Sequence, residues 1–139
     1  MPPLTRWFIR TGLVYLVLSL VTGVIAAADP VVQLPYPLAA LMPLYFQLLM
    51  VGWITQLIFG IAYWMFPIAS REDPRGNPQL GWVAYICLNA GLLIRGIADL
   101  TSVLGDFPAL PWATELSLIL QLVAAVAFVA NTWARVKGH

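Results

Sequence analysis

Four long apolar segments, separated by short polar ones, organise this chain. They predict helices over about residues 7–28, 38–67, 80–104 and 114–134. At a rise of ~1.5 Å per residue, about 20 residues cross a hydrocarbon layer ~30 Å thick, and each segment is at least that long. The pattern therefore predicts an all-α membrane protein, one domain over residues 1–139, in which four transmembrane helices form an up-down bundle.

The first segment also has features of a secretory signal peptide. Arg6 and Arg10 lie at its start, and residues 26–28 are three alanines that resemble a cleavage site. Its apolar run is longer than the core of a usual signal peptide. We therefore expect an uncleaved first helix.

The second segment holds polar residues although it carries no charge between Pro43 and Pro67. Polar groups inside lipid need partners, so this helix is expected to face other protein or a bound molecule. The side chains expected to contact a ligand or a partner, including one each in the third and fourth helices, are Tyr45, Gln47, Trp53, Gln56, Tyr63, Asn89 and Gln121. Small residues let membrane helices approach closely, and those expected to pack helices together are Ser19, Gly23, Gly52 and Gly60.

Arg95 and Asp99 lie four residues apart in the third helix. An arginine at the centre of a membrane helix costs about 2.5–3.5 kcal/mol on insertion scales, and pairing with a carboxylate one turn away lowers that cost. We predict an intramembrane ion pair that holds the end of the third helix in place. The alternative is a role for these two groups in proton transport.

The charges are few and unevenly placed: 9% of the residues are charged, 61% are hydrophobic and the net charge is +1. A soluble domain of this size cannot bury so many apolar residues, and so small a net charge gives no basis for binding nucleic acid. The basic residues outside the third helix, which belong to the N-terminus, the second loop and a C-terminal basic tail, are Arg6, Arg10, Arg71, Arg75, Arg135 and Lys137. By the positive-inside rule, both termini are expected on the cytoplasmic side of a bacterial inner membrane.

Few side chains offer chemistry. The only histidine is His139 and the only cysteine is Cys87, so neither a metal site nor a histidine-ligated haem is expected within the chain. No nucleophile has an adjacent base, so we predict that the protein is not an enzyme. A groove for a pigment, a quinone or a lipid, lined by Trp53, Gln56, Tyr63 and Trp64, is an alternative to plain helix packing.

The second segment contains Gly-Trp, Ile-Phe-Gly, Tyr and Pro in that order, at Gly52, Trp53, Ile58, Phe59, Gly60, Tyr63 and Pro67. In this it resembles the second helix of small four-helix membrane proteins related to subunit I of haem-copper oxidases and nitric oxide reductases. Residues 89–96 and 120–136 also look like the third and fourth helices of that group. The two histidines of the family's second helix would fall at Tyr45 and Gln47, so the resemblance implies the fold and the membrane setting without the haem ligands.

Together these features predict a non-catalytic integral membrane subunit of a bacterial respiratory or other electron-transfer complex, such as an oxidoreductase. It would pack against lipid and against larger membrane subunits. No cofactor is expected within the chain, and a lipid, quinone, haem or pigment at a subunit interface is compatible with the sequence. One alternative is a small haem- or pigment-binding electron-transfer protein, and a second is a small homo-oligomeric channel or transporter.

Overall fold

The structure is a computed structural model that describes residues 1–33, 35–68, 71, 74–105 and 110–136. These residues form helices and no strands. In chain order the helices are α1 (Pro3–Ala27), α2 (Asp29–Val32), η1 (Leu38–Leu41), α3 (Met42–Gln47), η2 (Leu48–Thr55), α4 (Gln56–Met65), α5 (Pro78–Leu104), α6 (Pro111–Thr132) and η3 (Trp133–Arg135). Helices η1 to α4 follow one another without a break and make up one long helical segment, the second span.

Within the described residues, four helical segments are long and apolar enough to cross a membrane: Pro3–Ala27, Leu38–Met65, Pro78–Leu104 and Pro111–Arg135. This confirms the prediction of an all-helical chain with four candidate membrane spans. Three of the segments begin at a proline, a few residues before the starts that the hydrophobic pattern indicates. Proline is favoured in the first helical turn, because its missing N–H is not needed there and its ring sets a helical φ.

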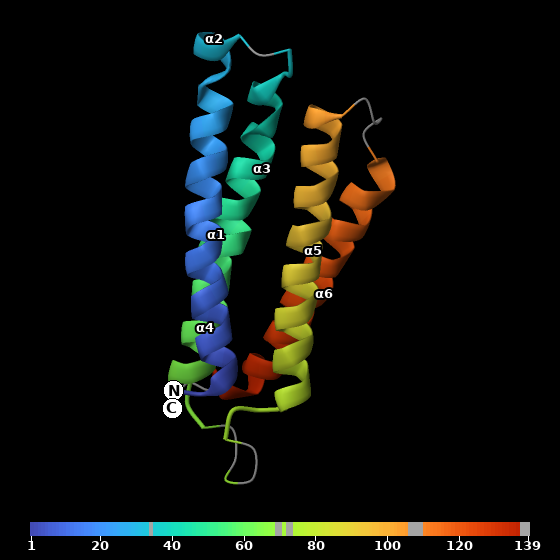
Figure 1. Ribbon diagram of the computed structural model, residues 1–139. Coiled ribbons are helices and arrows are strands. Elements are labelled where there is room, and N and C mark those ends of the chain that lie inside the picture. The colour runs from blue at the N-terminus through green and yellow to red at the C-terminus, as the bar shows by residue number, and fades with distance from the viewer. Residues whose placement is uncertain (34, 69–70, 72–73, 106–109, 137–139) are drawn as a thin grey trace.

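Figure 1 shows the start of α1 and the end of α6 at one end of the molecule, with α2, the end of α5 and the start of α6 toward the other. The closest backbone contacts lie within two pairs, α1 with the second span and α5 with α6. Helix α5 also contacts α1, η1, α3 and η2. It therefore joins the two pairs, while α6 crosses it at the edge of the molecule.

Aromatic rings of α1 lie over glycines of the second span. A Cβ atom added to Gly52 would lie 2.8 Å from Cγ of Tyr15, and one added to Gly60 would lie 2.8 Å from Cβ of Phe8. Both distances are well inside the usual carbon–carbon contact of ~3.5–4.0 Å. Glycine at these two positions therefore allows the two helices to approach each other closely.

Aromatic contacts also join the two pairs of spans. Phe59 of α4 stacks on Phe128 of α6, with ring centroids 3.9 Å apart and planes within 3° of parallel. Phe8 of α1 meets Tyr85 of α5 edge to face, at a centroid distance of 5.1 Å. Such pairs contribute about 0.5–1.5 kcal/mol beyond the area that they bury. Side chains thus add contacts between the two pairs of spans.

The outward faces of the four spans are apolar. Large exposed side chains include Val24 on α1, Met65 on α4, Ile97 on α5 and Leu122 on α6. Water-soluble monomers rarely expose a continuous apolar surface larger than a few hundred Å². These faces suit contact with hydrocarbon.

Replacing Gly60 with alanine should destabilise the protein, because the new methyl group would meet Cβ of Phe8 at 2.8 Å. Overpacking of this kind costs about 1–3 kcal/mol. Gly12→Ala is the matched control, since a Cβ there would meet its nearest neighbours, in Leu57 and Trp53, at 3.6 Å. We expect a lower melting temperature in detergent for Gly60→Ala alone; equal melting temperatures for the two variants would contradict the close packing of Phe8 on Gly60.

Candidate functional site

Gln56 lies at the centre of a hydrogen-bonded cluster that joins three spans. Its side chain is 0% exposed. Its Oε1 accepts a hydrogen bond from Thr11 Oγ1 of α1 at 2.6 Å, and its Nε2 donates to Asn89 Oδ1 of α5 at 2.8 Å. Asn89 Nδ2 donates in turn to the backbone oxygen of Tyr85 at 2.8 Å. In this cluster, which we call the Gln56 cluster (Thr11, Gln56 and Asn89), both amides are paired through oxygen and nitrogen alike.

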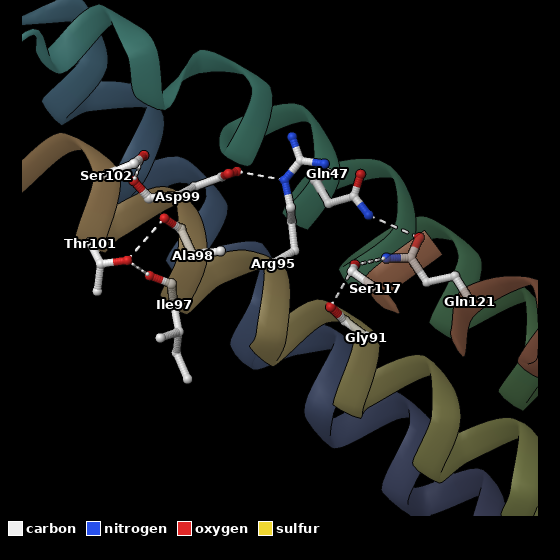
Figure 2. A network of polar contacts seen from close by, with 10 residues as sticks. All are labelled: Gln47, Gly91, Arg95, Ile97, Ala98, Asp99, Thr101, Ser102, Ser117 and Gln121. Carbon is white, nitrogen blue, oxygen red and sulfur yellow. Dashed lines mark hydrogen bonds and ion pairs between the residues drawn. The ribbon is translucent and has the colours of Figure 1, made fainter. Parts of the chain in front are cut away.

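A second cluster, the Gln47 cluster (Gln47, Gln121 and Ser117), joins α3, α6 and α5. Gln47 Nε2 donates to Gln121 Oε1 at 2.9 Å, and Gln121 Nε2 donates to Ser117 Oγ at 3.0 Å. Ser117 Oγ donates to the backbone oxygen of Gly91 at 2.8 Å. Figure 2 shows this chain of contacts running from the second span across α6 to α5. The cluster therefore connects the two pairs of spans in the interior.

Arg95 and Asp99 form an ion pair in the structure. Nε of Arg95 lies 2.8 Å from Oδ2 of Asp99, and each side chain is 19% exposed. Figure 2 shows the Arg95 guanidinium joined to the Asp99 carboxylate one turn further along α5. Because both partners belong to α5, the pair neutralises a charge without tying α5 to another span.

Trp53 lies in η2, a π-helical stretch in the middle of the second span. Within this stretch Thr55 Oγ1 donates to the backbone oxygen of Met50, five residues earlier, at 2.9 Å. The indole Nε1 of Trp53 is buried and has no hydrogen-bond partner among the described residues. π-Helical turns are rare and occur frequently at functional sites. The amino-acid pattern of this segment, which reads as ordinary apolar helix, gave no signal for it.

The other predicted residues pack helices together. The ring of Tyr45 covers Gly23, where an added Cβ would lie 2.9 Å from the ring's Cδ2. Ser19 is fully buried and donates to a backbone oxygen of its own helix at 2.8 Å. Tyr63 is 5% exposed and lies beneath the guanidinium of Arg135, which is 5.8 Å from its ring centroid.

The predicted contact residues do not form one site. The structure pairs Gln47 with Gln121 and Gln56 with Asn89, and it keeps Tyr45, Trp53 and Tyr63 in separate surroundings. In the described part of the chain, no three His, Cys, Asp or Glu side chains lie close enough to share a metal ion. What the interior offers is paired amides and hydroxyls spread over several helices.

Arg135 was expected in a short C-terminal basic tail, and the structure instead buries it against the end of the second span. Its side chain is 2% exposed. Its guanidinium donates to backbone oxygens at the end of the second span, those of Tyr63 at 3.1 Å, Phe66 at 2.8 Å and Pro67 at 3.0 Å. The last carbonyls of a helix lack intrahelical partners and favour positive charge, so Arg135 caps α4. No local pattern signals this contact, because it joins positions 68–72 residues apart.

Comparisons of this chain with protein families, curated proteins and solved structures found no match. The fold itself defines the class, an all-helical protein with four candidate membrane spans. The resemblance to the haem-copper oxidase group stays a prediction.

The bond between Gln56 and Asn89 should be measurable as an interaction energy in a double-mutant cycle. Combining Gln56→Met with Asn89→Leu should give a coupling of about 0.6 kcal/mol, and at most about 1.7, as interhelical hydrogen bonds in membranes do. Reversible unfolding in mixed micelles measures it. The control cycle pairs Gln56→Met with Gln121→Met, which share no hydrogen-bond partner and should be nearly additive. Coupling of equal size in the two cycles would refute the proposed pairing.

Proposed function

We propose that this protein is a non-catalytic integral membrane subunit of a bacterial respiratory or other electron-transfer complex. In this proposal the four spans form an up-down bundle in the inner membrane, with both termini in the cytoplasm. One or more faces of the bundle pack against larger membrane subunits. The observation that carries the proposal is the pairing of Gln47, Gln56, Asn89 and Gln121 with one another across the spans.

Catalytic and binding sites usually present a few polar groups to a cavity, where a ligand can complete their hydrogen bonds. Here the interior amides complete one another's bonds instead, and the Arg95 charge is balanced by Asp99 one turn away. Polar groups that are already paired with one another can stabilise the helix arrangement, but they are not free to bind or activate a substrate. This favours a structural role within an assembly.

The electron-transfer setting rests on the resemblance of the second span to helices of the haem-copper oxidase group. The chain has Tyr45 and Gln47 where that group has histidines, so the proposal includes no haem ligated by this chain. A lipid, quinone, haem or pigment would instead lie at a contact with a neighbouring subunit.

Purification in a mild detergent should yield an assembly larger than the single chain, because permanent membrane subunits are held by extensive lateral contacts. Size-exclusion chromatography with mass spectrometry identifies the co-purifying subunits, and the absorption spectrum reports any pigment. A harsher detergent that releases the chain serves as the control. A clean monomer or homodimer without other proteins would count against the proposal.

The proposed orientation makes a separate prediction. A phosphatase reporter that is active only outside the cytoplasm should stay inactive when fused after Gly138, since the basic loops keep that end in the cytoplasm. The same reporter fused after Gly105, in the connection between α5 and α6, should be active and serves as the matched control. Activity at Gly138 and silence at Gly105 would reverse the orientation.

A further inference from the structure

A cavity of about 250 Å³ lies at the end of the molecule where α1 and α5 begin. Its lining comes from four segments of the chain and includes Pro3, Leu4, Tyr63, Arg75, Pro78 and Trp82. This end also holds the last turn of α4 and the end of α6. Because candidate membrane spans begin and end here, the cavity lies at the level where lipid headgroups meet the protein.

The backbone of Arg75 is fixed at this cavity by the end of α6. Its carbonyl oxygen accepts hydrogen bonds from Arg135 Nη1 at 3.4 Å and from Asn131 Nδ2 at 3.5 Å. The next residue, Gly76, has a φ of 74°, which glycine adopts without a steric penalty. A Cβ at Gly76 would lie 2.5 Å from Oδ1 of Asn131. The hydrogen bonds from Asn131 and Arg135 thus hold the backbone of this loop. The side chain of Arg75 is exposed and borders the cavity.

Tyr63 lines the same cavity from near the end of α4. The residue is 5% exposed. Its ring is held against the start of α5, since a Cβ added to Gly81 would lie 3.5 Å from Cζ, the atom that carries the hydroxyl. The cavity therefore has two side-chain donors of different kinds, a guanidinium and a buried phenol.

The first turns of α1 and α5 add partial positive charge. The N-terminus of a helix carries unpaired N–H groups and about half a positive charge, which favours anions. Neither first turn contains an acidic residue. None of the described residues that line the cavity is Asp or Glu. In the described part of the cavity wall, Arg75 and two helix ends thus each contribute positive charge.

We propose that this cavity binds the phosphate of an anionic phospholipid headgroup. Arg75 and Tyr63 donate to the phosphate oxygens, and the ends of α1 and α5 add to the attraction. Trp82, exposed near the start of α5, lies where indole rings meet the membrane interface. The apolar rim of Pro3, Leu4 and Pro78 suits the glycerol and upper acyl carbons of a lipid better than a free, hydrated anion. The site does not depend on the proposed partner complex.

The full chain, purified in a mild non-ionic detergent, is titrated with phosphatidylglycerol while its melting temperature is followed. The melting temperature should rise to saturation, because a lipid that binds the folded state stabilises it. Phosphatidylcholine, which has no net charge, should give a much smaller rise. Arg75→Gln should raise the half-saturating concentration of phosphatidylglycerol about tenfold, as expected for the loss of a charge-assisted hydrogen bond. Tyr63→Phe should raise it about threefold, because one neutral hydrogen bond is lost.

Arg71→Gln is the matched control, since it removes the same charge from an exposed arginine of the same loop that does not line the cavity. It should leave the half-saturating concentration within about twofold of the original. Equal weakening by Arg71→Gln and Arg75→Gln would mean diffuse attraction to the surface and would overturn the site. Inorganic phosphate that matches the effect of the lipid at the same concentration would overturn the lipid assignment. Each variant is compared with its own melting temperature without lipid, so a loss of stability is not mistaken for a loss of binding.

Discussion

Polar groups inside a bilayer must find their hydrogen-bond partners within the protein, because hydrocarbon supplies none. Four interior amides of this chain satisfy the constraint by pairing across spans, Gln47 with Gln121 and Gln56 with Asn89. Each pair forms only when its two helices are aligned along their axes and are rotated so that the two side chains face each other. The arrangement of the spans is thus tied to a few amides rather than to apolar contact alone.

The glycines set a different quantity, the distance between helices. Gly52 and Gly60 lie four residues before and four residues after Gln56, packed against Tyr15 and Phe8 of α1. Close approach at the glycines brings Thr11 within 2.6 Å of Gln56. Packing and hydrogen bonding are therefore coupled along one face of the second span, and a change at a glycine also strains the amide between them.

The spans were predictable from the sequence because a bilayer imposes one length and one polarity on every segment that crosses it. The first residue of each span was less predictable. Pro3, Pro78 and Pro111 look like helix breakers, but each is the first residue of its helix. The polar residues of the interior were recognisable one by one, because each stands out in an apolar run.

The partners of those residues were not predictable. Gln47 and Gln121 are 74 residues apart, and only the relative rotation of three helices brings them together. Arg135 was harder still, because an arginine after an apolar run usually extends to the membrane surface. Its burial depends on the end of α4 lying beside α6, a tertiary contact that leaves no trace in the local sequence.

The cap formed by Arg135 has a consequence for the order of folding. The carbonyls at the end of α4 precede Arg135 by 68–72 residues. At a synthesis rate of about 5–20 residues per second, roughly 3–14 s pass before their partner emerges. During that interval only water or lipid headgroups can solvate these carbonyls, which requires this end of the second span to wait at the membrane surface. The last step of folding is then the formation of the Arg135 hydrogen bonds at the membrane surface, after the apolar helices have already entered the membrane.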